Sequence, residues 1–231
     1  MSEGWSDEED EQLDDLPVST TNGNTSSYTM KRNPPGTLDN EFNQWEWEDI
    51  NKMDGTLAVQ QHLQQVINRD KSDMQALLEL PKNQDEAVWK YEHMRQFTME
   101  LGNLIALLDG VCTALTCPLM KCTDEWEYFC AAHDPPQQCC AIDYFIHTLK
   151  QTADTLNDTK LFHSRVSIPK GSAKHFQSMA RRLYRLFAHC FYHHRDIFDV
   201  YEEEHHLCER FSKFICKYRL VPKKQQIIKF H

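Results

Sequence analysis

The stretch that decides the fold of this chain runs from residue 180 to residue 198 and reads ARRLYRLFAHCFYHHRDIF. Three arginines are followed by three histidines, with large apolar residues between them. The apolar residues recur at the spacing of an amphipathic helix, whose apolar stripe faces a core. Guanidinium groups bind anions and imidazoles bind metal ions. This segment therefore predicts a helix in the core that offers an anion site, a metal site or both.

The arginines lie on one side of the expected helix. Successive residues turn by about 100° around a helix axis, so Arg181, Arg182 and Arg185 fall within an arc of about 100° opposite the apolar residues. Three guanidinium groups on one face can clamp a phosphate through bidentate, charge-assisted hydrogen bonds. A solvated basic face that pairs with acidic residues elsewhere is the alternative. The spacing alone does not choose between the two.

The histidines point to zinc together with a pair of cysteines far back in the chain. Cys112 and Cys117 stand in GVCTALTCP, and two thiolates with two imidazoles form a closed tetrahedral zinc shell. On a straight helix His189 and His193 lie about 40° apart, but His189 and His194 about 140° apart, so helix geometry favours His193.

Packing without a metal remains open as an alternative, because buried cysteines and histidine clusters are common in cores and on their rims. Other cysteines compete as ligands, although most stand in apolar contexts that favour packing: Cys122, Cys130, Cys139, Cys140, Cys190, Cys208 and Cys216.

Composition limits the classes of function. The 231 residues are 40% hydrophobic, which is enough for one well-buried core. The net charge is −10, but residues 1–15 carry eight acids and no Lys or Arg, so the rest of the chain has a net charge of only −2. A nearly neutral body excludes a broad nucleic-acid surface, and any phosphate binding must be local.

The cysteines bear on the cellular compartment. Nine cysteines without an apolar signal segment indicate a reducing compartment, where thiols bind metal or pack. No run of about eighteen apolar residues is present, so we expect no membrane span. The sequence predicts a cytosolic or nuclear protein.

The chain divides into three parts. Residues 1–36, rich in acids, Ser, Thr and Pro, predict a disordered acidic arm; residues 37–220 predict one all-α domain, and residues 221–231 a short tail. Helical periodicity is strong over 85–109, 142–156 and 174–218. The segment WEYFCAAH (residues 126–133) leaves strand and turn open. A short hairpin around 120–132 is the one β element that we expect.

Several long segments, in order, resemble the Mob family of kinase-adaptor proteins, and its phocein branch above all. They span about residues 31–220 and read GTLAVQQHLQQ, QDEAVWKYEHMRQF, EWEYFCAAH, AIDYFIHTL, FHSRVSI, RRLYRLFAHCFYHHRDIFD and LCERFSKFICKY. The resemblance implies an all-α fold around a four-helix bundle with one structural zinc. It implies Cys112, Cys117, His189 and His194 as the ligands, against the helix-wheel preference for His193.

The resemblance also bears on partners. In Mob proteins that dock phosphorylated kinase segments, a basic cluster precedes the first zinc histidine, and Arg181, Arg182 and Arg185 fall on those positions. Mob proteins that activate nuclear Dbf2-related kinases carry two glutamates where this chain has Gln84 and Val88. Losing two negative charges weakens attraction to a basic kinase segment, which favours the phocein branch.

The function implied is that of a non-catalytic adaptor. The phocein resemblance implies a striatin-type scaffold, phosphatase 2A subunits and germinal-centre (Ste20-type) kinases as partners, and a cytoplasmic place with peripheral association to Golgi or other membranes in trafficking. One alternative is a direct co-activator of nuclear Dbf2-related (Lats-type) kinases. A remote alternative is a zinc hydrolase with Glu92 or Glu125 as base, although the chain has no His-Glu-x-x-His arrangement.

Overall fold

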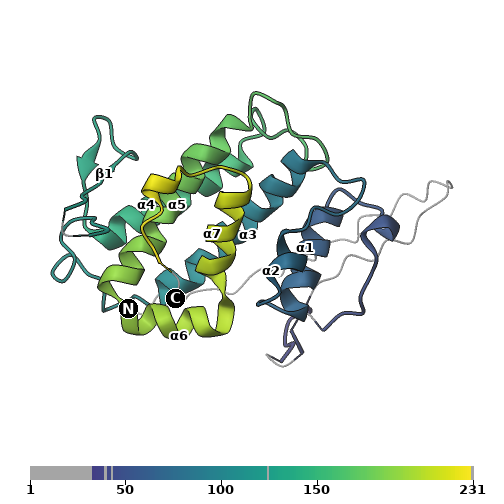
Figure 1. The fold of residues 1–231 in the computed structure, drawn as a ribbon, viewed down its shortest axis with the longest axis horizontal. Coiled ribbons are helices and arrows are strands. Elements are labelled where there is room, and N and C mark those ends of the chain that lie inside the picture. Colours follow the sequence, from purple (N-terminus) through teal and green to yellow (C-terminus); the bar gives the residue numbers. More distant parts are fainter. Residues whose placement is uncertain (1–32, 39–40, 43, 124, 230–231) are drawn as a thin grey trace, which may run out of the picture.

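The computed structural model describes residues 33–38, 41–42, 44–123 and 125–229, so the predicted acidic arm lies largely outside the described residues. Within them the chain is mostly helical, as the sequence predicts (Figure 1). The helices are α1 (Ala58–Arg69), α2 (Met74–Leu78), α3 (Glu86–Ala106), α4 (Ala141–Asn157), α5 (Lys174–His193), α6 (Arg195–His205) and α7 (Leu207–Lys217). Short 3₁₀ turns are η2 (Ile50–Lys52) and η3 (Lys223–Gln225), and the strands are β1 (Phe129–Cys130) and β2 (Gln137–Gln138).

Helix α3 is the central element, and it contacts α1, α4, α5 and α7. Its start is fixed by Asp85, whose side chain accepts hydrogen bonds from the backbone N–H groups of Ala87 and Val88. This cap satisfies donors that the first turn leaves unpaired. Helices α4, α5 and α7 surround α3, and contacts also join α5 to α4 and to α7 (Figure 1). These four helices form the bundle that the family resemblance implies.

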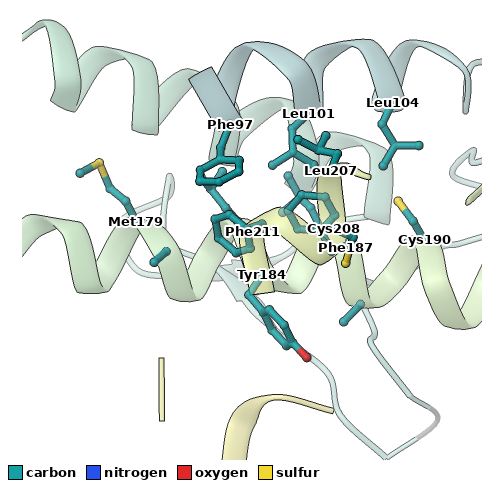
Figure 2. Close-up of a cluster of buried hydrophobic side chains, with 14 of the residues drawn as sticks. Phe97, Leu101, Leu104, Met179, Tyr184, Phe187, Cys190, Leu207, Cys208 and Phe211 are labelled. Atoms are coloured by element: carbon teal, nitrogen blue, oxygen red, sulfur yellow. The ribbon is translucent and has the colours of Figure 1, made fainter. Parts of the chain in front are cut away.

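The main core lies between these four helices (Figure 2). Phe97 and Leu101 of α3 meet Phe187 of α5 and Phe211 of α7, and all four side chains are fully buried. The ring of Phe211 lies edge-on to that of Phe97, with centroids 4.9 Å apart, and 5.0 Å from that of Phe187. Burying a large aromatic side chain contributes roughly 2–3 kcal/mol, so this contact carries much of the stability of the bundle.

A second, smaller core joins α1 and α2 to the first turns of α3. Trp89 is fully buried there, together with Leu63 of α1 and Leu77 of α2. Val88 belongs to this cluster and is 2% exposed. The start of α3 therefore contributes to this second core, and the side chain of Trp89 packs α1 and α2 against the bundle.

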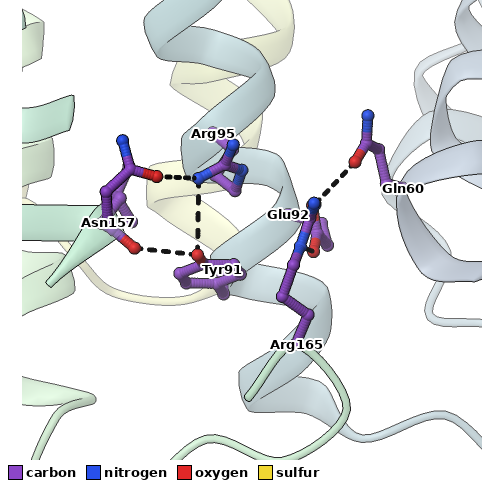
Figure 3. Close-up of polar contacts among 7 residues, drawn as sticks. Gln60, Tyr91, Glu92, Arg95, Asn157 and Arg165 are labelled. Atoms are coloured by element: carbon purple, nitrogen blue, oxygen red, sulfur yellow. Dashed lines mark hydrogen bonds and ion pairs between the residues drawn. The ribbon is translucent and has the colours of Figure 1, made fainter. Parts of the chain in front are cut away.

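Polar contacts tie long loops to α3 (Figure 3). Arg165, from the segment between α4 and α5, forms an ion pair with the buried carboxylate of Glu92 and also donates a hydrogen bond to Gln60 of α1. Tyr91 donates a hydrogen bond of 2.8 Å to the carbonyl of Leu156 at the end of α4. Buried polar groups of α3 thus anchor the end of α4 and the segment after it, and Arg165 connects that segment to α1.

The β structure is small and lies between α3 and α4. Strands β1 and β2 pair antiparallel, with Cys130 opposite Gln137, and an isolated antiparallel bridge joins Lys121 to Glu127. The bridge falls in the range 120–132, where we predict a hairpin. The two-stranded sheet extends further, to residue 138, within DPPQQCC (residues 134–140), a sequence typical of a loop. Strands of two residues each leave little periodicity for a sequence to reveal.

Within the described residues, no helix combines the length and the apolarity that crossing a bilayer requires. The nine cysteines all lie in described positions and none forms a disulfide.

Candidate metal centre and adjoining basic cavity

Four side chains that the sequence singles out meet at one end of the bundle. The sulfur atoms of Cys112 and Cys117 and a ring nitrogen each of His189 and His194 all lie within 4.8 Å of one another. Cys112 Sγ is 3.7 Å from His189 Nε2, and Cys117 Sγ is 3.5 Å from His194 Nε2. These pairs are 77 positions apart in the sequence, so only the folded bundle assembles them.

The donor set fits zinc in kind and in size. Tetrahedral zinc with Zn–S bonds of ~2.3 Å and Zn–N bonds of ~2.0 Å places neighbouring sulfur and nitrogen ligands about 3.5 Å apart. The two sulfur–nitrogen distances of 3.7 and 3.5 Å match that spacing. Two thiolates and two neutral imidazoles would balance the 2+ charge of the ion. Four protein ligands would close the shell, which is typical of structural rather than catalytic zinc.

A turn after α3 supplies the two cysteines. The N–H of Cys112 donates to the carbonyl of Leu108, and the N–H of Cys117 donates to the carbonyl of Thr113. Thr116 stabilises the turn because its hydroxyl donates to the carbonyl of Val111 at 2.7 Å. The loop is thus held by its own hydrogen bonds, with both sulfurs turned toward α5.

The ring of His189 is oriented by a carbonyl outside the donor set. Its Nδ1 lies 2.6 Å from the carbonyl oxygen of Lys121, which can only accept, so Nδ1 carries the proton. Nε2 is then unprotonated and faces Cys112. Burial lowers the pKa of His189 to about 4, so the ring is neutral at pH 7. A carbonyl behind a neutral histidine is the usual arrangement around metal-binding imidazoles.

The donor cluster contains His194 rather than the His193 that the helix wheel favours, because α5 is not straight through the histidines. The helix ends at His193, and His194 has φ −136° and ψ 48° before α6 begins at Arg195. This turn brings the buried His194 ring to Cys117, whereas the exposed His193 stacks on His189 without joining the donor cluster. No proline or glycine marks the break, so it could not be seen in the sequence.

The cysteines that competed as ligands divide into two groups. Cys190 and Cys208 are fully buried in the main core, and Cys122 is buried against α5 with its sulfur 3.5 Å from the carbonyl of Arg185. Cys130 is also fully buried in the main core and Cys139 packs against it, and both lie with two histidines in a separate donor cluster. Most of the competing cysteines therefore pack in or against the core, as the sequence predicts, and two of them also belong to a second donor cluster.

The three arginines of α5 do not all face one space. Arg182 turns toward α4, where its guanidinium donates to the side-chain oxygen of Gln151. Arg185 donates a hydrogen bond of 2.8 Å to the hydroxyl of Tyr144 and lies 4.2 Å from the ring centre of Tyr128, in a cation–π contact. Arg181 is exposed. The arc seen on the helical wheel is therefore divided by the neighbouring helix.

Arg181 and Arg185 line an open cavity of about 620 Å³ beside α5. Its other walls are residues 125–128 and the C-terminal turn, which contributes Lys224 and Gln225. Three cationic side chains thus face one space. Glu125 and Glu127 also line it, and Glu127 is neutralised by Lys121 at 3.1 Å. Sequence reasoning missed Lys224, because nothing in VPKKQQ indicates that the tail folds back onto α5.

Gln84 and Val88 flank the first residues of α3, where the family resemblance places two glutamates in kinase-activating members. Val88 is buried in the core with Trp89, and Gln84 and Val88 line a cavity of about 80 Å³ with Arg165. Asp85 is exposed but its carboxylate is occupied as the cap of α3. A glutamate at position 88 would have to displace this packing.

Comparison with known proteins identifies the family of this chain. The model of the Mob1/phocein family matches residues 65–228. The chain is 48% identical over 202 residues to MOB kinase activator-like 4 of Drosophila melanogaster, covering 87% of this chain and 91% of that protein. It is 45% identical over 204 residues to MOB-like protein phocein of Caenorhabditis elegans, covering 88% and 92%.

A more distant relative is named for a kinase. DBF2 kinase activator protein MOB1 of Saccharomyces cerevisiae is 29% identical over 147 residues, covering 60% of this chain and 47% of that protein. The family match and the two closer relatives cover the helices that supply the cysteines, the histidines and the arginines. The chain belongs to the Mob1/phocein family.

Proposed function

We propose that this chain is a non-catalytic adaptor, stabilised by zinc at Cys112, Cys117, His189 and His194, that binds a phosphorylated protein segment in the cavity beside α5. The observation that carries the proposal is that α5 bears both features, since it supplies two metal donors at its C-terminal end and two cations to the cavity. Zinc would fix the end of the helix, and the helix would present Arg181 and Arg185 together with Lys224.

A phosphate fits the cavity better than a carboxylate would. A phosphate dianion has three acceptor oxygens and can bind several guanidinium and ammonium groups together. Tyr128 and Trp126 provide an aromatic wall against which residues flanking a phosphate can pack. Glu125 at the rim would select for basic residues next to the phosphorylated one.

For the partners we propose those of the phocein branch: a striatin-type scaffold, phosphatase 2A subunits and germinal-centre kinases. Two observations support this choice. The two closer relatives are named phocein and MOB kinase activator-like 4, and the residue at position 88 is the buried, apolar Val88. Membranes, including the Golgi, would be reached only through these partners, from the cytoplasm.

The second candidate is direct co-activation of a nuclear Dbf2-related kinase, which the yeast relative's name supports. The surface at the start of α3 argues against it, because Gln84 is neutral and Val88 is buried. A zinc hydrolase fits poorly. Glu92 is held by Arg165, Glu125 lines the cavity, and neither is among the donors of the cluster.

Two measurements test the proposal. The tagged chain is purified from its own cells, and its partners are identified by mass spectrometry. We expect striatin and phosphatase 2A subunits. Recovery of Dbf2-related kinases in their place would select the second candidate. Fluorescence anisotropy then compares phosphothreonine peptides from the recovered partners with their unphosphorylated forms. Equal affinity for both forms would contradict a phosphate site.

A further inference from the structure

An open groove of about 650 Å³, here named the α6 groove, lies between α6 and the last turn of α3. Helix α6 connects the end of α5 to the start of α7 at one end of the bundle (Figure 1). Leu107, directly after α3, lines the opposite side of the groove. Among the described residues, none lines both this groove and the basic cavity beside α5. The α6 groove is therefore a separate surface.

The walls of the α6 groove carry apolar side chains that the fold leaves in water. Val200 of α6 is 72% exposed and Leu107 is 54% exposed, while Ile197 is half-buried against the main core. Tyr201 is buried, and its hydroxyl donates to the carbonyl of Glu100 at 3.1 Å, which holds α6 against α3. Exposed apolar side chains that gather in one groove mark a surface for a binding partner.

Acidic side chains flank the exposed valine along the lip of the groove. Asp196, Val200 and Glu204 all line it, and because they are four positions apart on α6 they follow one another along the same side of the helix. With a rise of about 1.5 Å per residue, the two acids lie about 12 Å apart along the helix axis. The lip therefore presents a carboxylate, an apolar side chain and a second carboxylate, one turn apart.

These two carboxylates are open to a cation from outside the chain. Within the described residues, neither Asp196 nor Glu204 forms an ion pair with a Lys or Arg side chain. The ring of His205 is 3.8 Å from Glu204, but burial, and then Lys71, lower the pKa of His205, so the ring is neutral at pH 7. Lys71 contacts the other nitrogen of that ring at 2.9 Å and does not line the groove. The groove is therefore both apolar and negatively charged.

We propose that the α6 groove binds an amphipathic helix of a partner protein, in which an apolar residue stands between two Lys or Arg residues, four positions before it and four after it. The apolar residue packs on Val200 and Leu107, and the two cations pair with Asp196 and Glu204. Docking of a helix into a groove between two helices is a common mode of peptide recognition. The charges fix the register and the choice of partner more than the affinity.

Charge argues against the other occupants of such a groove. Helix α6 has five carboxylates and one arginine, a net charge of −4 with neutral histidines. A second copy of this chain, packed symmetrically through the same face, would bring like charges together. Residues 1–15 carry eight acids and no Lys or Arg, and anionic lipids are negative as well. A basic helix is the occupant that the groove attracts.

Photo-crosslinking from the groove tests for this partner. The full-length chain with p-benzoylphenylalanine in place of Val200 is irradiated in an extract of its own cells, and the crosslinked peptide is sequenced by mass spectrometry. The same replacement of Lys160, exposed in the loop after α4, is the control. We expect, from position 200 only, a segment with the basic–apolar–basic spacing. No crosslink above the control, attachment to this chain itself, or a segment without that spacing would each overturn the proposal.

Matched variants then test the groove with a synthetic peptide of the crosslinked segment, by fluorescence anisotropy. Val200→Lys should weaken binding about tenfold, and Glu204→Lys about fivefold. Glu203→Lys makes the same charge change one position earlier on the same helix, at an exposed residue outside the groove, and should cost less than about twofold. Equal losses in Glu203→Lys and Glu204→Lys would reduce the effect to the net charge of α6 and overturn the groove.

Two controls separate binding from folding and from the cavity beside α5. Val200, Glu203 and Glu204 are all exposed, so thermal melts should be the same for the three variants and the unchanged chain. Binding of phosphopeptides should also stay unchanged in them, because none of these residues lines the basic cavity. The two proposals can therefore fail separately.

Discussion

The ring of His189 donates through Nδ1 to the carbonyl oxygen of Lys121, 2.6 Å away. This hydrogen bond sets the tautomer of a metal-facing ring, and it also joins α5 to the segment that ends in the hairpin. Lys121 pairs through its side chain with Glu127 on the wall of the basic cavity. The metal centre and the cavity therefore share a structural neighbour.

The choice between two adjacent histidines tests the first centre. His194→Gln should lose the ion that Cys117 helps to hold and lower the melting temperature by about 10 °C, because structural zinc contributes several kcal/mol and each is worth about 2–4 °C at this length. His193→Gln, one position earlier, should keep the ion. The metal content and the melting temperature are measured for both variants. Loss of zinc in His193→Gln but not in His194→Gln would mean that α5 continues past residue 193.

The divided arginines give a test within one helix. Arg185→Ala should weaken phosphopeptide binding at least tenfold, since a charge-assisted pair is worth about 1.5–3 kcal/mol. Arg182→Ala should change it less than twofold, because that side chain is turned to Gln151. Lys224→Ala should lie between them. Anisotropy titrations measure the affinities, and thermal melts verify that each variant is folded. Equal losses of affinity in Arg182→Ala and Arg185→Ala would show that the three arginines act as a unit.

The ion pair in Figure 3 predicts a stability effect with a known sign. Glu92 has a side chain only 1% exposed; burial raises its pKa and the Arg165 guanidinium opposes that rise. Arg165→Met should destabilise the fold by about 3 kcal/mol, because it leaves a buried carboxylate unpaired. Urea unfolding at pH 7 measures the free energy.

A double substitution separates the pair from mere packing. Glu92→Leu together with Arg165→Met should recover most of the loss, since apolar residues of similar volume replace buried pairs at little cost. Additive losses in the double variant would contradict an electrostatic origin.

A buried imidazole predicts acid sensitivity. His93 is 1% exposed and stacks on Phe214 with ring centres 4.9 Å apart; burial first, then Arg210 and Lys217, lower its pKa well below 6.5. The unfolded chain therefore binds a proton below pH 6.5 that the folded chain does not. Stability from this group is present above pH 6.5 and is lost as the pH falls, by about 1 kcal/mol per pH unit.

His93→Phe should remove that part of the slope, because phenylalanine keeps the aromatic contact without the titrating nitrogen. The exposed His163, changed to Gln, is the control and should leave the slope unchanged. The free energy of unfolding is measured between pH 7.5 and 5.5 with zinc in excess. The half-buried His62 and His205, whose pKa values burial also lowers, contribute to the slope in every variant. An unaltered slope in His93→Phe would assign the acid sensitivity to other groups.

The helices could be predicted because their apolar residues recur with helical spacing over many turns. Helix α3 shows this, with Asp85 as a visible cap and Trp89, Phe97 and Leu101 on its buried side. The first metal centre was predictable in its residue types but not in its geometry. The break at His194 depends on tertiary packing of α5 and α6, and local sequence does not encode it visibly.

The cavity and the second cluster depend on longer-range placement. Lys224 reaches the arginines through a tail whose own sequence has no periodicity. Gln151 draws Arg182 away, which a single-helix wheel cannot represent. Cys130 ends one strand of two residues and Cys139 follows the other, and strands this short set no sequence pattern. Only the hairpin register brings the two cysteines to His147.

The separations along the chain between the metal donors carry a consequence for the order of folding. Cys130 and His147 are 17 positions apart, but Cys112 and His189 are 77 apart. Closing the longer loop costs about 1 kcal/mol more in chain entropy and also requires that α3 and α5 have docked. The hairpin cluster can close as soon as α4 has been synthesised, whereas the bundle cluster must wait for α5. On a ribosome-bound chain, the donors of the hairpin cluster should therefore come together before those of the bundle cluster.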